Sequence, residues 1–568
     1  MLFLLSLFGG RLVQVQGFDA SALAAQALEN RTQTEPLYAH RGDIVDARGT
    51  VLATTIELRD IRVDQTLVGQ YRRRVGDERV PVGVRGAAED LAPFLGIGVD
   101  TLTAELTGTN KGATIARGVR PDLAREILRL AVPGLYAYQA SRRVYDNGAV
   151  AANVLGWVDR EGQARGGMEQ ALNSSLTGTD GRLVYEKSLD GATIPTGVIS
   201  ETDPRDGCSV RLTIDRDLQW KAQELLAAQV KATGSQHGYA VVLDARTFAV
   251  RALATVPTFD PNHPERATQD TINDRSMLDT FEPGSTAKVI TLSAALEEHK
   301  ATPTTPFTVP PFVKRSDAVF HDAETHGTEK LTLAGVLAQS SNIGTILTGE
   351  RLQPETLSRY QRLFGLGTPT GVGLPESSGL LSDWRSWSGT QHYTVMFGQG
   401  MSVTALQAAG VFATLANDGV RLRPQLVAGT TCADGVFHPA APSQPLRVVS
   451  TDTARQMRLM MEQVVGEHGT AVKASIPGYR VAGKTGTAQI PGNGGYLPGA
   501  YTASFIGMAP ADAPGLVVAV VLDRPSKGSH FGGDIAAPVF RDLMAWALRQ
   551  DKIPPTGTTP PRIPLRWN

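Results

Sequence analysis

The stretch "FEPGSTAKVITL", residues 281–292, places a serine directly after a proline and a glycine, and a lysine three residues later. Pro283 and Gly284 interrupt regular structure, whereas the residues after Ser285 are apolar and typical of a buried helix. A spacing of three places Lys288 on the same helical face as Ser285. A lysine is therefore expected inside an apolar helix, one turn after a serine that begins it.

A buried lysine beside a serine has a chemical use. Desolvation disfavours the ammonium form and lowers the pKa of Lys288 from about 10.4 toward neutrality. The neutral amine can then remove the Ser285 proton, and unpaired N–H groups at a helix N-terminus can stabilise an oxyanion. Because this spacing occurs by chance about once in a chain of this length, the pair alone identifies nothing.

A second polar group lies in "LAGVLAQSSNIGTIL", residues 333–347, where an apolar helical pattern is interrupted. Ser340 and Asn342 are two residues apart, so in a turn or extended segment their side chains point the same way. A hydroxyl and an amide placed in this way can transfer a proton and bind a substrate amide. A plain turn between two helices is the alternative interpretation, because serine and asparagine favour turns.

The third group is "VAGKTGTAQI", residues 481–490, which has the pattern of a strand. Gly483 and Gly486 lack side chains, so we expect a ligand backbone to lie alongside them. The hydroxyl groups of Thr485 and Thr487 can bind a carboxylate. Lys484, directly before Thr485, adds a positive charge, which should lower the pKa of Lys288 further.

The three groups follow one another as S-x-x-K, S-x-N and K-T-G, separated by 55 and 144 residues. This order is typical of penicillin-binding proteins and class A β-lactamases. The chain resembles the class B penicillin-binding proteins over nearly its whole length, in four further stretches: "RGDIVDARGTVLA" (41–53), "GWVDREGQARGGMEQALNSSLTGTDG" (156–181), "GLGTPTGVGLP" (365–375) and "FGQGMSVTALQAAGVFATLANDG" (397–419). "RLVQVQ" (11–16) and "HDAETHGTEKLTLAGVLAQSSN" (321–342) are similar to the cell-division, FtsI-type members.

The spacing of apolar residues predicts the fold class without reference to the family resemblance. Residues 213–234 predict a helix capped by Thr213 or Asp215, and residues 239–256 and 502–525 predict two hairpins. Strands at both ends of this region, with helices between them, indicate an α+β domain whose antiparallel sheet joins distant segments.

The resemblance implies a serine transpeptidase and β-lactamase-like domain, an antiparallel sheet flanked by helices, after an elongated β-rich N-terminal pedestal. We expect four regions: a partial transmembrane anchor (1–11), a non-catalytic pedestal and dimerisation domain (12–210), a transpeptidase domain (211–552) and a loose proline-rich tail (553–568).

The resemblance also implies that the chain crosslinks peptidoglycan stem peptides through a serine acyl-enzyme, during septal wall synthesis, and binds β-lactams covalently. No metal or cofactor is expected. The implied partners are stem peptides, β-lactams, the cell membrane, a membrane glycan polymerase and other division proteins. The implied catalytic residues are Ser285, Lys288, Ser340 and Lys484, and the implied substrate-binding residues are Asn342, Thr485, Gly486 and Thr487.

Four alternatives stay open. An elongation-type transpeptidase differs only in its partners and timing. A D,D-carboxypeptidase would use the same three motifs with a different accessory domain, and a β-lactam sensor would need several membrane spans. A β-lactamase would need a deacylating glutamate. "EQALN" (169–173) resembles that signature, but it precedes the nucleophile and is better assigned to the N-terminal module.

Composition and the N-terminal residues indicate which partners and which cellular compartment to expect. The net charge of −1 gives no basic surface for nucleic acid. Cys208 and Cys432 are most simply two separate thiols, although one disulfide is possible. The ten apolar residues of "MLFLLSLFGG" (1–10) reach about 15 Å, half of a bilayer core. We expect the outer end of one anchor helix that begins upstream, with the catalytic part outside the cytoplasm; a buried N-terminal helix is the alternative.

Two positions depart from the family pattern. Ala47 precedes Arg48 where an aspartate is usual, which leaves the expected ion pair of that aspartate in doubt. Phe248 replaces a frequent glycine in the turn of the first hairpin, so this turn is expected to differ.

Overall fold

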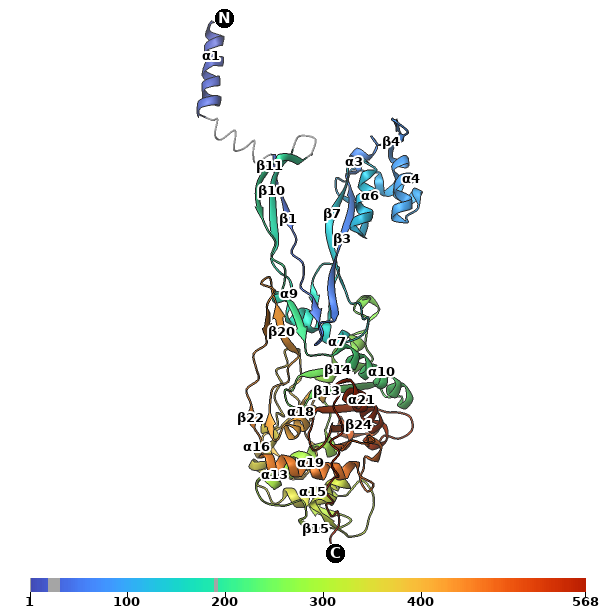
Figure 1. The fold of residues 1–568 in the computed structure, drawn as a ribbon, viewed down its shortest axis with the longest axis vertical. Helices are drawn as coiled ribbons and strands as arrows, with labels where there is room; N and C mark the ends of the chain where they lie inside the picture. The colour runs from blue at the N-terminus through green and yellow to red at the C-terminus, as the bar shows by residue number, and fades with distance from the viewer. Residues whose placement is uncertain (1, 19–30, 188–192) are drawn as a thin grey trace.

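The computed structural model describes residues 2–18, 31–187 and 193–568. Two arms extend from one end of a larger globular part (Figure 1). The first arm is an antiparallel sheet in the order β1-β10-β11. Its strands are β1 (Thr32–Leu37), β10 (Gly181–Lys187) and β11 (Thr193–Thr202).

The second arm is built on the long strand β3 (Val51–Val63), which pairs antiparallel with β6 and β7. Short helices cover this sheet around a separate apolar core that includes Ile61, Leu91 and Ile127. The other elements of this arm are α3 (Gln65–Val68), β4 (Arg72–Val75), β5 (Glu78–Pro81), α4 (Gly83–Leu95), α5 (Val99–Leu106), β6 (Ala113–Val119), α6 (Pro121–Arg129) and β7 (Leu135–Val144).

The globular part contains a five-stranded antiparallel sheet in the order β14-β13-β25-β24-β23. The expected sheet of distant segments is thus confirmed, because the first two strands and the last three are more than 200 residues apart. The strands are β13 (His237–Asp244), β14 (Val250–Val256), β23 (Ala482–Gly492), β24 (Gly495–Ala509) and β25 (Leu516–Asp523).

Helices cover this sheet in two layers. One layer consists of α10 and α21, which contact each other and the sheet, and the other contains α18 and α19. Because β25 is buried along nearly all of its length, both faces of the sheet are covered. The main helices are α10 (Arg216–Thr233), α13 (Lys288–Glu297), α14 (Leu333–Ala338), α15 (Asn342–Gly349), α16 (Pro354–Leu363), α18 (Ala405–Ala416), α19 (Thr451–Val465) and α21 (Ala537–Gln550).

Local signals in the sequence placed several of these elements correctly. Asp215 caps α10 by accepting the N–H groups of Asp217 and Leu218, and Gly234 ends the helix with φ +60°. Both predicted hairpins form. Phe248 stands where a glycine is frequent in the β13–β14 turn, and it adopts φ +59°, which is uncommon for residues other than glycine. Its ring is fully buried, and this packing stabilises the conformation.

A further sheet joins the arms to the globular part. β12 (Ser209–Leu212) pairs with β2 (Ile44–Val45) on one side and with β20 (Val427–Thr431) on the other. β20 in turn pairs with β21 (Phe437–Pro439) and follows β19 (Val420–Arg421), which pairs with β22 (Leu446–Arg447). A segment inserted late in the chain therefore extends the sheet that begins in the second arm.

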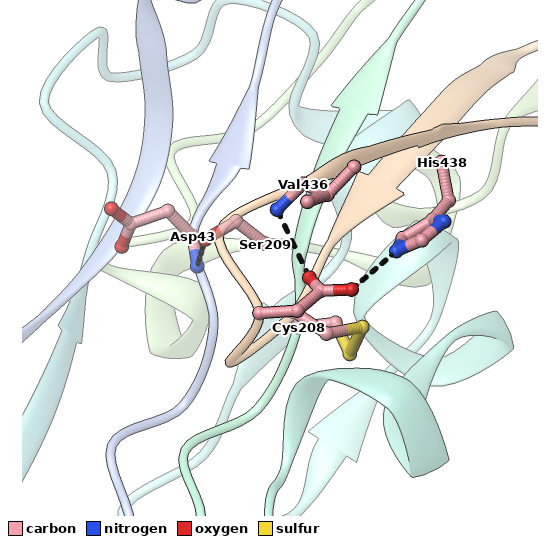
Figure 2. Close-up of a disulfide and its surroundings, with 7 residues drawn as sticks. Asp43, Cys208, Ser209, Val436 and His438 are labelled. Carbon is pink, nitrogen blue, oxygen red and sulfur yellow. Dashed lines mark hydrogen bonds and ion pairs between the residues drawn. A yellow bond between two sulfur atoms is a disulfide. The ribbon is translucent and has the colours of Figure 1, made fainter.

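Cys208 and Cys432 form a disulfide (Figure 2), so the interpretation as two separate thiols was wrong. The register of β12 and β20 pairs Ser209 with Thr431, and the two cysteines follow as the next pair. Their Cα atoms are 4.1 Å apart although 224 residues separate them. Asp434 shapes the adjoining turn by accepting hydrogen bonds from the Val436 N–H and the His438 ring.

The proline-rich end of the chain is docked, which corrects the expectation of a loose tail. The Trp567 indole N–H donates to the Phe307 carbonyl at 3.1 Å, and the Thr332 N–H donates to the Leu565 carbonyl at 3.0 Å. Prolines preset an extended backbone, and the aromatic residue at its end gives that backbone a specific contact.

At the other end, α1 (Leu2–Val13) continues into a π-helical turn, Gln14–Phe18. None of the helices in the described ranges has the length and apolar character needed to cross a bilayer. The sequence "RLVQVQGFDASALA" (11–24) is typical of a helix that continues, but its residues 19–24 lie outside the described residues.

We expect the disulfide to stabilise the junction between the arms and the globular part. Replacing both Cys208 and Cys432 with serine should lower the free energy of unfolding by about 2–4 kcal/mol, because it releases a long closed loop. Denaturant unfolding of the oxidised protein and the double variant measures this difference. Reductant should destabilise the parent protein and leave the variant unchanged. Alkylation of two free thiols in the native protein would contradict the assignment.

Candidate active site

Ser285 lies on a 3₁₀ turn, Gly284–Ala287, that runs directly into α13. Gly284 has φ +51° and donates its N–H to the Gly398 carbonyl, which fixes where the turn begins. Within the described ranges the Ser285 hydroxyl makes no hydrogen bond, and the residue is partly exposed. The predicted position of Ser285 at a helix start is confirmed, and its hydroxyl is open to an incoming ligand.

The second motif occupies the sharp turn between α14 and α15. Ser340 adopts φ +62°, an uncommon conformation for a residue other than glycine. The Lys288 amine donates to the Ser340 carbonyl and lies 3.3 Å from the Ser340 hydroxyl oxygen. From the third motif, Lys484 donates to the same hydroxyl oxygen at 2.9 Å. Two amines from distant segments thus converge on one serine.

Both lysine side chains are completely buried. Burial lowers the pKa of Lys288 to about 7, and the carboxylate of Asp322 acts in the opposite direction. Burial also lowers the pKa of Lys484 well below its ordinary value, with a further contribution from the charge of Lys288. The expected loss of basicity at Lys288 is confirmed. The repulsion between the amines, expected to act on Lys288, acts on Lys484 instead.

The K-T-G segment belongs to β23, the edge strand of the five-stranded sheet. The Thr485 hydroxyl bonds with the Thr470 hydroxyl at 2.8 Å, and the Thr487 hydroxyl oxygen accepts the Gly532 N–H at 3.1 Å. Both threonines therefore have fixed hydroxyl positions beside Lys484.

The two glycines of this segment make room for protein atoms on the side where their Cβ atoms would lie. A Cβ atom on Gly486 would lie 2.3 Å from the Ser504 hydroxyl and 3.0 Å from the Pro283 carbonyl oxygen. One on Gly483 would lie 2.4 Å from the Phe505 ring. Gly486 thus allows the turn that carries the nucleophile to pack against β23.

Sequence reasoning missed Asp322. One of its carboxylate oxygens accepts the Ile343 N–H at 2.9 Å; the other accepts the Ser341 hydroxyl at 2.7 Å and lies 3.1 Å from the His326 ring. The Asn342 side-chain N–H donates to the neighbouring His321 carbonyl at 3.0 Å. This segment therefore fixes the turn that contains Ser340 and Asn342. Asp322 lies in the stretch 321–342, but its sequence neighbours do not indicate that it contacts the turn about twenty residues later.

Glu282 is a second missed residue. Its two carboxylate oxygens accept the Gly400 N–H at 2.8 Å and the Tyr496 hydroxyl at 2.9 Å. Burial raises the pKa of this carboxyl group. It connects the nucleophile turn with the tip of the β23–β24 hairpin. In the part of the chain that the structure describes, no group of three or more His, Cys, Asp or Glu side chains could hold a metal ion.

The sequence matches two protein families. Residues 36–212 match the penicillin-binding protein dimerisation domain, and residues 238–545 match the penicillin-binding protein transpeptidase domain, more than half of the chain. The chain belongs to the penicillin-binding protein transpeptidase family. The expected fold class is confirmed with it: an α+β transpeptidase domain after an elongated, β-rich N-terminal part.

Individual members of this family are similar over nearly full length. The chain is 34% identical to penicillin-binding protein PbpB of Mycolicibacterium smegmatis (98% of this chain, 90% of that protein). It is 33% identical to the peptidoglycan D,D-transpeptidase FtsI of Escherichia coli K12 (97% and 90%). The solved structure of penicillin-binding protein 3 from Mycobacterium tuberculosis complexed with aztreonam has a TM-score of 0.73 and 30% identity (94% and 100%).

The contacts of Arg48 and Glu169 in this penicillin-binding protein show what each side chain does. Arg48, which lacks the usual preceding aspartate, forms an ion pair with Asp215 at 2.8 Å. Glu169 is fully buried between Arg41 and Arg143, at 2.6 and 2.7 Å. The assignment of Glu169 to the N-terminal module is confirmed, since two arginines of that module neutralise its charge.

The pKa of Lys288 predicts how acylation varies with pH. Below pH 7 the amine is protonated and cannot accept the Ser285 proton, so the rate of acylation by benzylpenicillin should rise through about pH 7 and then level off. Asp322→Asn removes a negative charge that raises this pKa, so the inflection should move to lower pH by about one unit or less. Stopped-flow acylation at each pH measures both curves.

Asp217→Asn is the matched control, because Asp217 is paired with Arg216 on the surface of α10. This variant should keep the parent inflection. Asp322→Asn can also lower the plateau rate by loosening the Ser340 turn, so the position of the inflection is the informative quantity. A shift to higher pH would contradict the assigned effect of Asp322.

Proposed function

We propose that this penicillin-binding protein crosslinks peptidoglycan stem peptides through an acyl-enzyme on Ser285. The observation that supports this most directly is the convergence of Lys288 and Lys484 on the Ser340 hydroxyl, with Lys288 itself one helical turn after Ser285. A buried amine with a pKa of about 7 can act as a base at neutral pH, and a second buried amine can stabilise negative charge beside it.

In the first half-reaction, Ser285 Oγ attacks the carbonyl carbon between the last two D-alanines of a stem peptide. Lys288 accepts the hydroxyl proton, and the backbone N–H groups of Ser285 and Thr487 stabilise the oxyanion. As the C–N bond breaks, a proton passes through the Ser340 hydroxyl to the leaving D-alanine. In the second half-reaction, an amine of another stem attacks the acyl carbon, gives up a proton and releases Ser285.

The substrate binds as an added strand. β23 is an edge strand, and its free edge can pair with an extended peptide. Asn342 binds the peptide amide from the opposite side. Lys484, Thr485 and Thr487 bind the terminal carboxylate, and Gly486 lets the nucleophile turn lie close to this strand.

We propose the following organisation, with the boundaries predicted from the sequence. Residues 12–210 are the non-catalytic pedestal and dimerisation domain, residues 211–552 the transpeptidase domain and residues 553–568 the tail. Residues 1–11 belong to a single-pass anchor in the cell membrane, with catalysis on the extracytoplasmic side. The disulfide supports this location, because disulfides persist in oxidising compartments.

The proposed setting is septal wall synthesis. The chain would act there with a membrane glycan polymerase and other division proteins. The similarity to E. coli FtsI supports this assignment over an elongation role, since the similarity extends across the N-terminal part as well as the catalytic part.

The covalent intermediate gives the direct test. Benzylpenicillin should add one equivalent to the protein by intact mass, and peptide mapping should place it on the segment containing Ser285. Ser285→Ala should carry no adduct, while Ser293→Ala on the same helix should react normally. An adduct that persists in Ser285→Ala would show that another residue is the nucleophile.

A chromogenic cephalosporin distinguishes this function from a β-lactamase. We expect a burst of about one equivalent and then very slow turnover, because neither Glu169 nor Glu282 is placed to activate water. Glu169 is neutralised in the N-terminal module, and both oxygens of Glu282 accept hydrogen bonds from the protein. Rapid steady hydrolysis would favour the β-lactamase interpretation.

Lys288→Arg should retain positive charge and lose acylation, by about a factor of 10²–10⁴, because a guanidinium stays protonated and cannot act as a base. The acylation rate with benzylpenicillin measures the effect. Lys473→Arg, a surface residue paired with Asp534, is the control and should react at the parent rate. A near-normal rate for Lys288→Arg would assign the base to another group.

A further inference from the structure

A cavity of the transpeptidase domain is lined by residues of α18, β19 and β22 and of the segments beside them; Figure 1 labels α18 and β22. Its volume is about 380 Å³, and no residue of the three catalytic motifs lines it. Phe364, Leu406 and Leu422 contribute apolar wall. A cavity of this size holds a small organic molecule and is much larger than one water or one inorganic ion requires.

Arg421 lines this cavity without a counter-ion. Within the described ranges no carboxylate lies within ion-pair distance of its guanidinium, and its single hydrogen bond is a long one of 3.4 Å to the Arg362 carbonyl. The side chain is half-buried, and desolvation lowers its pKa from the ordinary value. A desolvated cation without a partner is unfavourable, and an anion in the cavity would relieve this.

The neighbouring groups are also donors. Arg423 lines the same cavity, and no carboxylate of the described residues pairs with it. The Ser443 hydroxyl oxygen accepts the Arg423 N–H at 2.5 Å, which leaves the hydroxyl proton available to a ligand. Two glycines make room for the guanidinium groups: a Cβ atom on Gly365 would lie 2.6 Å from Arg421 Nη1, and one on Gly371 would lie 3.2 Å from Arg423.

The carboxylates on the adjoining segments are already engaged. Glu376 accepts hydrogen bonds from the N–H groups of Thr370 and Gly371 and from the Thr370 hydroxyl. Asp418 forms an ion pair with Arg458 at 2.9 Å. The cavity therefore has an excess of positive charge and of hydrogen-bond donors that the protein itself does not neutralise.

We propose that this cavity binds a small organic acid whose carboxylate lies between Arg421 and Arg423, with the Ser443 hydroxyl as a further donor. A planar guanidinium matches a carboxylate with two parallel hydrogen bonds, and the apolar wall accepts the body of the ligand. Peptides with a free C-terminus and sugar acids both present this chemistry. Wall fragments, which the proposed function brings to this enzyme, are sources of each.

The test uses the full chain after reaction with benzylpenicillin, so that the catalytic serine is blocked. Intact mass first verifies one adduct per chain; failure at this step concerns the proposed function and leaves the cavity to be tested on unreacted protein. The probes are diacetyl-L-Lys-D-Ala-D-Ala, its C-terminal amide, N-acetylmuramic acid and inorganic phosphate. Saturation-transfer NMR titrations measure each affinity.

We expect at least one of the two organic acids to bind, and Arg421→Gln to weaken it about tenfold, since a charge-assisted bidentate contact is lost. Arg421→Lys should recover only part of the affinity because it lacks the planar fork. Arg423→Gln, at an exposed position, gives the same direction of change without risk to folding. Arg541→Gln, an exposed arginine on α21, is the control and should bind normally.

Three results would overturn the proposal. The first is that neither organic acid binds the acylated protein. The second is that the amide binds as tightly as the peptide acid, or that the Arg421 and Arg423 variants bind like the parent. The third is that phosphate binds as tightly as the organic acids, since the cavity would then recognise only charge.

Discussion

Two lysine side chains, both without solvent exposure, approach the same serine hydroxyl, and the catalytic half of the structure is arranged around that contact. Two ammonium groups in a dry site cannot both remain charged at low free energy, so the surroundings must determine which amine holds the proton. Burial lowers the pKa of both amines, that of Lys288 to about 7 against the opposing carboxylate of Asp322 and that of Lys484 with a further contribution from the charge of Lys288, so a neutral amine is available as a base near neutral pH.

Packing keeps the three segments at this separation. The left-handed turn at Ser340 directs its carbonyl and hydroxyl toward the amines, and Asp322 fixes the following residues. The missing side chain at Gly486 lets the nucleophile turn reach the edge strand. The left-handed Ser340, the buried Asp322 contacts and the glycine at position 486 are each unfavourable for, or not required by, folding. Their occurrence together at one place therefore indicates a functional site.

The features that the sequence predicted depend on neighbours a few residues away. The Asp215 cap, the hairpins and the Ser285–Lys288 pair are encoded within one or two turns of chain. The missed features depend on contacts between distant segments. The role of Asp322 follows from α15 lying beside residues 321–326, and the disulfide follows from the register between β12 and β20. Nothing near Cys208 in the sequence indicates that Cys432 is its neighbour.

The docking of the tail and the contacts of Gly486 could not be predicted for the same reason. Prolines indicate an extended backbone but not the surface on which it lies, and a glycine indicates close approach but not of which atoms. In both cases the contacting group lies on another element. The tail contacts the Phe307 carbonyl, and Gly486 lies against the Ser504 hydroxyl.

The junction between the arms and the globular part has a mechanical consequence. A single peptide connection from β12 to α10 would act as a hinge, but the Cys208–Cys432 bridge and the β12–β20 pairing add a second attachment beside it. Two attachments side by side resist rotation and transmit torque. The segment held by the bridge continues directly from β20 back to Arg421, so the junction with the arms and the wall of the cavity lined by Arg421 share one stretch of chain.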